Sequence, residues 1–438
     1  MRVKDKVRED DGERQELVLT VVASPEEVKR YTDQFFGELN KREIAGFRKG
    51  KAPRAVLEQS VGGHDRAMGG VAETLINEGG FAAIDEADVI FIDEPQFNVE
   101  APPEEGSAFT FTVSGPVAPL MKLTNHGPVS IEMPPEEATD RDVERQIEQL
   151  RDHYHSFEDI TDPAHEAALG DYVNVTLTVT NHDKVVSGLK GTSRMIGLGQ
   201  GSMPASFDEH LIGAKAGEIR EFDFEAKDEE GNSDYGDGEL HAVVEVDSFR
   251  KYVLPALDDD FAGKVGCANV DDLRAQVKRS VGMQKAEELP RVKVDRAIDA
   301  LLERLDGEVP AYYVDFFRQD VGREFMQDLE KQGTNLQQWM LQNAVNGDEM
   351  RDEIAEEALR RASIDCALES LFAEKGLEVT EEDVAALFEG DDDPQATRKM
   401  WEDAHRMADV HKMARQHKAT QWLVDNAVVT IVEDGPAA

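Results

Sequence analysis

The segment Gly46–Pro53 contains the residues whose types and spacing best suit a chemical task, and that task is anion binding. It reads Gly46-Phe47-Arg48-Lys49-Gly50-Lys51-Ala52-Pro53, so three cations lie within four positions. An arginine guanidinium forms a two-pronged hydrogen bond to phosphate or carboxylate, whereas lysines act as point charges. The ring of Phe47 is costly to leave in water unless it docks against a partner. We call Gly46–Pro53 the basic loop and predict that it docks on an anionic partner; the alternative is an ordinary solvated turn.

The basic loop contrasts with a strongly acidic chain. The 438 residues carry a formal net charge of −43. Between Lys41 and Arg54, six basic residues oppose one acid, so this segment carries about +5 and the remainder about −48. Phosphate would repel most of that remainder, which argues against binding to DNA, to nucleic acid in general or to a membrane surface. The charge pattern therefore predicts one specific anionic contact.

Two helices must hold the basic loop. Residues 16–23 read as a strand, and Ser24-Pro25-Glu26-Glu27 then combines an N-cap, a proline at the first helical position and a capping box. Apolar residues recur every three or four positions up to residue 39, which predicts a helix. Glycines at 46 and 50 end that helix, and Pro53 prevents its return.

The residues after the basic loop complete an α+β head. Residues 54–82 read as helical, with expected interruptions at the glycine pairs 62–63 and 69–70. Apolar, β-branched runs predict strands at 89–92 and 109–113. The head is expected to end at residue 115.

The remaining chain divides into three parts with different patterns. Five prolines between 115 and 135 indicate an extended linker, followed by a charged amphipathic helix at 139–157. From residue 171 to 253 the apolar period is two, which indicates a small β-rich module. From 257 to 428 nearly every segment reads as helical, with long helices expected at 270–304, 310–332, 348–376 and 395–426. The fold class expected is therefore multidomain α+β, with a long, irregular, all-α body.

The basic loop resembles the ribosome-docking signature of trigger factor, a family of bacterial chaperones. The resemblance extends to the Gly-Gln-Gly turn at 197–201, to Gly213-Ala-Lys-Ala-Gly217-Glu218, to 254–261 and to 308–311. It implies a ribosome-binding head at 1–115, and a linker and helix at 116–150 that join the helical body. It also implies a prolyl isomerase domain similar to FKBP at 151–250, a helical chaperone domain at 251–432 and a disordered tail at 433–438.

The resemblance also implies a proline pocket walled by aromatic rings, and here the chain departs from the family. Leu177, Val186 and Arg194 fall where the family has rings. Phe207 takes the pocket floor, Tyr235 supplies a phenol, and Met203 joins this divergent pocket. FKBP-type isomerases lower the rotation barrier of about 18–20 kcal/mol by desolvating and twisting the amide. We therefore expect low or absent isomerase activity.

Other chemistries find little support in the sequence. His405, His411 and His417 are spaced by six residues, which does not place them on one helix face, so no metal site is expected. The glycines at 197–201 lack the Lys-Ser/Thr of a phosphate loop, so no nucleotide or other cofactor is expected. The two cysteines lie far apart, no secretory signal begins the chain, and no apolar stretch is long enough to span a membrane. The expected location is the cytoplasm.

Aromatic and methionine side chains are scattered along the charged helices of the tail. One interpretation is a helix–helix core; the other is a dispersed surface that holds unfolded segments, since methionine adapts to many partners. The client-binding candidates are Phe316, Phe317, Phe325, Met326, Trp339, Met340 and Trp401. The acidic surroundings favour basic clients.

The resemblance to trigger factor implies an ATP-independent chaperone that docks on ribosomal protein and RNA at the tunnel exit and shelters nascent or unfolded polypeptides. It is expected to act as a monomer or weak homodimer, without membrane or DNA partners. Two alternatives stay open: an active multidomain prolyl isomerase, and a holdase or assembly factor that does not use the ribosome.

Overall fold

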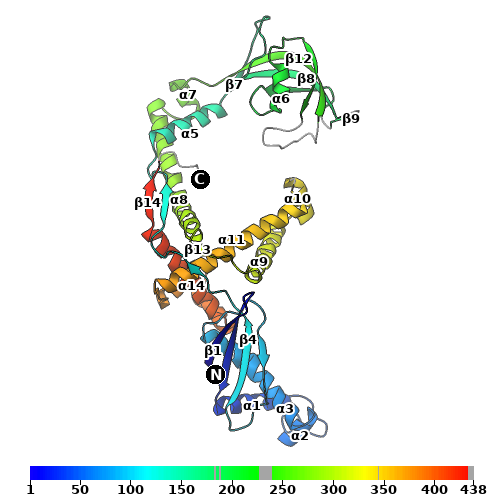
Figure 1. Ribbon diagram of the computed structural model, residues 1–438, viewed down its shortest axis with the longest axis vertical. Coiled ribbons are helices and arrows are strands. Elements are labelled where there is room, and N and C mark those ends of the chain that lie inside the picture. Colours follow the sequence, from blue (N-terminus) through cyan, green and yellow to red (C-terminus); the bar gives the residue numbers. More distant parts are fainter. Residues whose placement is uncertain (182–183, 187–188, 226–238, 344, 433–438) are drawn as a thin grey trace. The chain divides into compact units, whose positions relative to one another are not determined.

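The computed structural model describes residues 1–181, 184–186, 189–225, 239–343 and 345–432. The chain divides into two compact units, one formed by Met1–Pro134 with Pro290–Ala438 and the other by Pro135–Leu289 (Figure 1). Both units contain helices and strands, so the expected multidomain α+β class is confirmed. The expected domain boundaries at 115, 150 and 250 stay predictions. No helix in the described ranges is long and apolar enough to cross a membrane.

A four-stranded antiparallel sheet forms the centre of the head. Its strands follow the order β1–β2–β4–β3, which are Arg2–Asp10, Gln15–Ala23, Phe109–Pro116 and Gln96–Asn98. Every second residue of β2 is buried, as a strand with one face on the core requires. The sequence does not indicate β1, because this edge strand carries charges on both faces and exposes nearly every residue.

The strand expected at 89–92 does not form. Asp88 adopts a left-handed φ of +53° just beyond α4 (Phe81–Glu86), and the chain turns there. Val89 is buried in the head core, and the Ile92 N–H donates to the Pro116 carbonyl at 2.9 Å. The apolar residues at 89–92 therefore contribute to the core without forming a strand, and the next strand, β3, begins four residues later.

Three helices support the basic loop: α1 (Pro25–Asn40), α2 (Arg54–Ser60) and α3 (His64–Leu75). The capping box at the start of α1 is confirmed, because Ser24 and Glu27 exchange both hydrogen bonds. The interruption expected at residues 69–70 is wrong, since α3 runs through both glycines before the π-helical turn η1 (Ile76–Gly80). A Cβ atom on Gly70 would lie 2.6 Å from the ring of Phe35, so this glycine permits close packing of α1 and α3.

The residues after the head contain short strands where an extended linker was expected. β5 (Lys122–Leu123) pairs with β13 (Leu305–Asp306), and β6 (Ser130–Met133) pairs in parallel with β14 (Val428–Ile431). Their partners lie far along the chain, so no local pattern indicates these ladders. The linker thus joins the head to the helical body through two small sheets.

The β-rich module belongs to the second unit. Its sheet has the order β10–β8–β12–β11, with β7 added to β12 and β9 added to β8. The strands are β7 (Ser156–Asp159), β8 (Asp171–Asn181), β9 (Lys184–Val185), β10 (Thr192–Gly197), β11 (Ile219–Glu225) and β12 (Glu239–Val253). The short helix α6 (Ala205–Leu211) packs on this sheet and contributes Phe207 to its core.

Two helices and the first part of a third complete the second unit. They are α5 (Asp140–His153), α7 (Asp259–Lys264) and the N-terminal part of α8 (Val270–Leu302), packed around Ile147 and Phe261. Lys285 of α8 places its Nζ 2.5 Å from Asp142 Oδ2 at the start of α5. Burial raises the pKa of Asp142, but hydrogen bonds from Lys285 and Thr139 outweigh it and lower the pKa to about 2.

The helical body of the first unit is built on α9, α11 and α14. Its helices beyond α8 are α9 (Ala311–Lys331), α10 (Leu336–Asn343), α11 (Gly347–Glu374), α12 (Glu381–Ala386), α13 (Pro394–Asp403) and α14 (Met407–Asn426). The single helix expected at 395–426 is two helices, because His405 adopts a left-handed φ of +52° between them. Asp85 and Asp88 of the head bind α14, the second through a 2.7 Å ion pair with Arg415.

The Gly70 contact generates a matched pair of stability predictions. Gly70→Ala should destabilise the head by about 1–3 kcal/mol, because its methyl group overlaps the Phe35 ring. Gly69→Ala in the same helix meets nothing within 4 Å and should stabilise α3 by up to about 1 kcal/mol, because alanine has the higher helix propensity. Amide hydrogen exchange within α3 measures both effects. Equal protection in the two variants would show that the close approach does not constrain the head.

Asp142 generates a prediction for pH. Its folded-state pKa lies below the ordinary value of 3.8, so its contribution is present above that value and is lost as pH falls toward 2. Asp142→Asn should weaken the docking of α5 on α8 by about 2 kcal/mol at neutral pH, and the difference should shrink between about pH 4 and pH 2.

Hydrogen exchange in α5, corrected for the intrinsic rate at each pH, measures this difference. Glu148→Gln is the control, because Glu148 forms an exposed ion pair with Arg151 on the same helix and should change little. A pH-independent deficit in Asp142→Asn would contradict the assignment to carboxylate charge.

Candidate functional site

The basic loop connects α1 to α2, and Asn40 at the end of α1 holds its backbone. The Asn40 carbonyl accepts the Gly50 N–H at 2.9 Å, and its Oδ1 accepts the Ala52 N–H at 3.2 Å. Within the loop, the Lys51 N–H donates to the Arg48 carbonyl at 2.9 Å. One residue therefore fixes two points of the loop, which limits the conformations of its tip.

Both glycines of the basic loop adopt backbone conformations that other residues avoid. Gly46 has a φ of +84° and Gly50 a φ of +81°. A Cβ atom at either position would meet nothing within 4 Å, so space does not select glycine there. The left-handed φ does, because it costs an ordinary residue about 1–2 kcal/mol.

The base of the basic loop is buried and its tip is exposed. Ala52 is 7% exposed and packs with Leu39 and Leu57 in a small apolar cluster beneath the loop. Phe47 is 41% exposed. The loop thus presents an aromatic ring to solvent from a fixed base, as the docking prediction requires.

The structure separates the six cations between residues 41 and 54 into two groups. Lys41 pairs with Glu38 at 2.5 Å, and Arg54 binds Glu58 and Glu105 while its guanidinium lies 4.5 Å from the Phe36 ring centroid. The other four cations are exposed and have no side-chain hydrogen bond or ion pair within the described ranges; they are Arg42, Arg48, Lys49 and Lys51. Sequence reasoning placed Arg42 outside the docking set, although its charge is equally uncommitted.

The residues predicted for the isomerase pocket gather in the core of the β module. Leu177 and Phe207 are fully buried and Met203 is 6% exposed, while Val186 is partly buried against the same cluster. Arg194 lies exposed on β10, and Tyr235 falls outside the described residues. These positions therefore offer little aromatic surface to a peptide.

Sequence reasoning missed two rings that pack against Phe207. Phe222 and Phe224 of β11 approach it edge-to-face, with centroid distances of 5.2 and 5.1 Å. Their alternate positions, in a region where the apolar period is two, were the available signal, because residues two apart on a strand share a sheet face. The three rings pack as a core beside Leu177.

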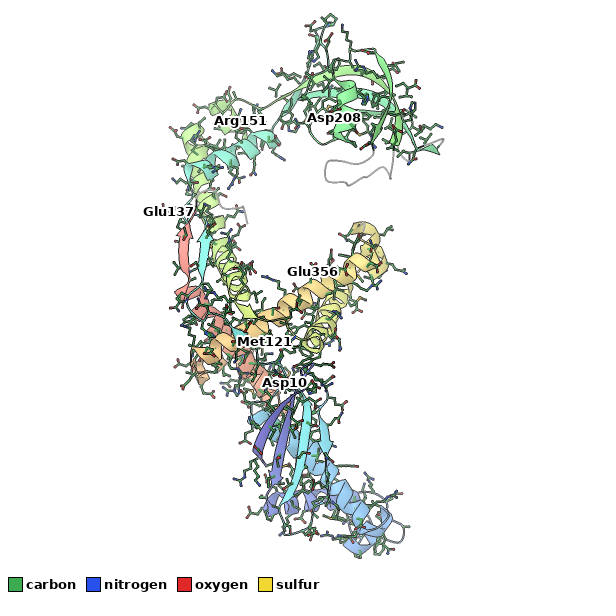
Figure 2. The ribbon with its side chains drawn as sticks, viewed as in Figure 1. Asp10, Met121, Glu137, Arg151, Asp208 and Glu356 are labelled. Atoms are coloured by element: carbon green, nitrogen blue, oxygen red, sulfur yellow. The ribbon has the colours of Figure 1, made fainter. Side chains whose placement is uncertain are left out.

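Asp208, labelled in Figure 2, follows Phe207 in α6 and is buried. Its Oδ2 accepts the Gly199 N–H at 2.8 Å and so holds the glycine-rich turn at 197–201, one of the segments that resemble the family. Burial raises the pKa of Asp208, and the Gly199 hydrogen bond opposes that rise. The Asp208 carboxyl group therefore has a structural role, which is to hold this turn in place.

The client-binding candidates differ in accessibility. Met326 is 45% exposed, whereas Phe325 packs edge-to-face on Trp339 at 5.1 Å. Phe316 and Phe317 are partly buried beside Tyr313, and Trp401 packs against Val410 and its neighbours. Met340 is also partly buried. Leu341 of α10, which sequence reasoning missed, is 84% exposed.

Two adjoining clefts lie between the head and α9 in the first unit. The larger, about 780 Å³, runs from the β1–β2 turn at Gly12–Arg14 to residues 308–318. The smaller, about 220 Å³, is lined by Ile92, Tyr312 and Phe316. Of the predicted client residues, Phe316 therefore borders a concave surface.

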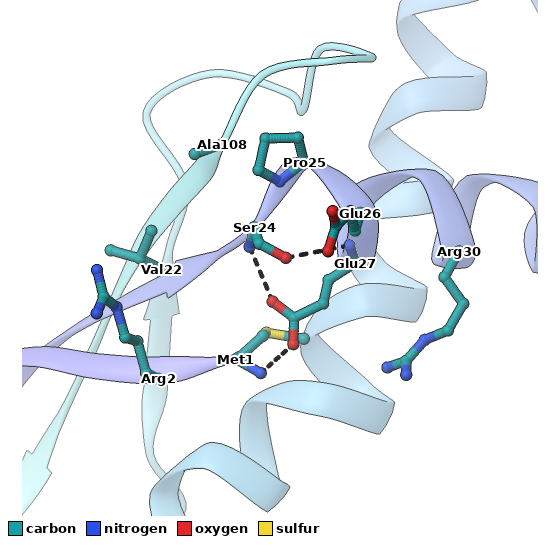
Figure 3. A pocket seen from close by; sticks show the side chains of 9 residues that line it. All are labelled: Met1, Arg2, Val22, Ser24, Pro25, Glu26, Glu27, Arg30 and Ala108. Atoms are coloured by element: carbon teal, nitrogen blue, oxygen red, sulfur yellow. Dashed lines mark hydrogen bonds and ion pairs between the residues drawn. The ribbon is translucent and has the colours of Figure 1, made fainter.

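A further cleft, of about 680 Å³, lies where α1 begins (Figure 3). The Glu27 carboxylate faces into it, accepts the Ser24 N–H at 2.8 Å and pairs with the Met1 amine. Glu27 is thus occupied as a helix cap. These contacts of Glu27 hold the N-terminal end of α1, and the basic loop follows the other end of the helix.

Comparisons with known proteins point to one family. The model described as "Bacterial trigger factor protein (TF)" matches residues 5–150, and that described as "Bacterial trigger factor protein (TF) C-terminus" matches 269–425. The chain is 26% identical to "Trigger factor" of Bacillus mycoides (strain KBAB4), over 94% of this chain and 97% of that protein. It is 29% identical to "Trigger factor" of Lysinibacillus sphaericus (strain C3-41), over 85% and 86%.

One solved structure is also similar over most of its length. Its title is "Promiscuous Substrate Recognition in Folding and Assembly Activities of the Trigger Factor Chaperone". The TM-score is 0.40 at 20% identity, covering 96% of this chain and 99% of that one.

Proposed function

The chain belongs to the trigger factor family of ribosome-associated chaperones, and we propose that it docks on the ribosome through the basic loop. Phe47 inserts into an apolar cleft of a ribosomal protein at the tunnel exit. Arg48, Lys49 and Lys51 pair with RNA phosphate or acidic side chains, and Arg42 adds a fourth contact at the base of the loop. The observation that carries this assignment is a set of four exposed cations between α1 and α2, three on the basic loop and Arg42 before it. None of them forms a side-chain hydrogen bond or ion pair with the described residues.

The proposed clients are nascent and other unfolded polypeptides, bound without ATP. The clefts beside Tyr312 and Phe316 and the exposed Met326 and Leu341 supply separate apolar contacts along the body. Several weak contacts suit clients that share no sequence, because each can be used or left free. The net charge of −43 favours clients that are rich in lysine and arginine.

The oligomeric state, the lack of DNA binding and the location that we propose follow from the net charge and from ribosome docking. Strong negative charge opposes self-association and DNA binding, so we propose a monomer or weak homodimer that does not bind DNA. A protein that docks on ribosomes works where they are, so we propose a cytoplasmic location.

We further propose that the β module has low or absent prolyl isomerase activity. FKBP-type catalysis needs a ring-walled pocket open to the peptide, whereas Phe207 here is fully buried among Phe222 and Phe224. Leu177 is a buried aliphatic residue at a position where the family has a ring. The module then serves as a folded arm of the chaperone.

The docking assignment predicts a loss of ribosome binding on charge reversal. The double substitution Arg48→Glu with Lys49→Glu should weaken co-sedimentation with ribosomes at least about tenfold, because two charge-assisted contacts become repulsive. Wild-type binding should also weaken as salt rises, since ions screen exposed charges beyond about 10 Å at 0.1 M.

Lys41→Gln is the matched control, because Lys41 already pairs with Glu38 and should bind ribosomes nearly as wild type does. Both variants should still suppress aggregation of an unfolded protein in solution. Wild-type sedimentation of the double variant would refute the docking role of the basic loop.

The isomerase assignment predicts the outcome of a protease-coupled assay on an X-Pro peptide. Catalysis should lie far below that of an active FKBP-type enzyme measured alongside. Phe207→Ala should lower module stability by about 3–5 kcal/mol, because it empties a buried ring position, while leaving the residual catalysis nearly unchanged. High turnover that disappears in Phe207→Ala would instead establish the active multidomain isomerase.

A further inference from the structure

β14 is an exposed apolar strand with one open edge. Val428 is 56% exposed on one face, and Val429 and Ile431, on the other face, are 39% and 54% exposed. Figure 1 draws β14 beside β6, which is its sole strand neighbour in the described ranges. A two-stranded ladder this short leaves much apolar surface in water.

The hydrogen bonds of β14 show which groups face outward. The Val428 N–H donates to the Val129 carbonyl at 2.8 Å, and the Val432 N–H donates to the Met133 carbonyl at 2.9 Å. Because alternate residues of a strand point to the same neighbour, Thr430 also faces β6. The backbone N–H and C=O groups of Val429 and Ile431 therefore point away from β6, along the open edge.

This edge lacks the features by which proteins usually protect edge strands. β14 contains no lysine, proline or bulge, whereas the edge strand β1 carries charges on both faces. On the other side of the ladder, Arg296 donates to the Glu132 carbonyl of β6, so that edge has a partner. The outer edge of β14 therefore differs from the edges of β1 and β6, because neither charged side chains nor a hydrogen-bond partner among the described residues protects it.

We propose that the outer edge of β14 binds an extended apolar segment of an unfolded client by adding it as a third strand. The groups of Val429 and Ile431 supply main-chain hydrogen bonds, and the exposed Val and Ile side chains supply apolar contact. Main-chain recognition needs no particular sequence, which suits a chaperone. The inference rests on the proposed chaperone function and adds the mode by which clients bind.

Charge around the strand selects the kind of client. Residues 425–434 read Asp-Asn-Ala-Val-Val-Thr-Ile-Val-Glu-Asp, with acids at both ends and no cation. An apolar segment flanked by lysine or arginine complements this pattern. Pairing of two copies through this edge is disfavoured by the net charge of −43 that each carries.

The test uses the full-length protein and a labelled, capped peptide, Lys-Val-Thr-Val-Thr-Val-Lys. Fluorescence anisotropy measures its affinity, and amide hydrogen exchange measures the protection of β14. Exchange at Val429 and Ile431 should slow when the peptide is added, whereas Val428 and Thr430, which already bond to β6, should change little. The same peptide with Glu in place of Lys should bind about tenfold more weakly.

A pair of variants isolates the main-chain contact. Val429→Pro removes an outward N–H while the inward bonds to β6 remain, a placement that edge strands tolerate. It should weaken peptide binding about tenfold. Val429→Thr keeps the N–H and the branched shape and should bind as wild type does.

Three results would overturn the proposal. They are equal binding by the two variants, protection of Val429 and Ile431 before peptide is added, and concentration-dependent dimerisation that Val429→Pro abolishes. Ribosome co-sedimentation separates this inference from the docking assignment. The Val429→Pro variant should co-sediment with ribosomes as wild type does. The Arg48→Glu, Lys49→Glu variant should bind the peptide with wild-type affinity.

Discussion

The structure depends on one electrostatic constraint: a chain with a net charge of −43 can approach a polyanion only through cations that it does not use internally. Elsewhere its basic residues form many ion pairs, such as Arg415 with Asp88 and Lys285 with Asp142. The basic loop is different. Lys41 and Arg54 bind acids at its base, and the cations between them stay exposed. The ribosome attachment that we propose therefore depends on a few side chains.

Presenting those cations requires a rigid base, and the head provides it by close packing. Gly70 lets the Phe35 ring of α1 lie against α3, and Asn40 then holds the loop backbone that follows α1. Ala52 returns the chain to the core before α2. A flexible loop would lose conformational entropy on docking, whereas this one has been ordered by folding.

The body differs from the head, because it leaves apolar side chains exposed at the surfaces that we propose bind clients. Met326 and Leu341, the clefts beside Phe316 and the edge of β14 are separate surfaces within the first unit. The net negative charge opposes contact between such surfaces on two copies of the chain. In the β module, by contrast, the rings of Phe207, Phe222 and Phe224 pack in the core, where they stabilise the fold.

Local sequence alone determined the basic loop, the capping box of α1 and the alternation of β2 and β8, because each depends on neighbouring residues. Tertiary structure decided the rest. Gly69 and Gly70 read as a helix break, but α3 runs through both, and the Phe35 ring packs against Gly70 alone. Val89–Ile92 reads as a strand, but Asp88 turns the chain there. The pairing of β6 with β14 joins segments far apart in the chain, so no local pattern encodes it. The pairing of Arg54 with Glu105 is likewise a tertiary fact, because only folding brings that acid beside it.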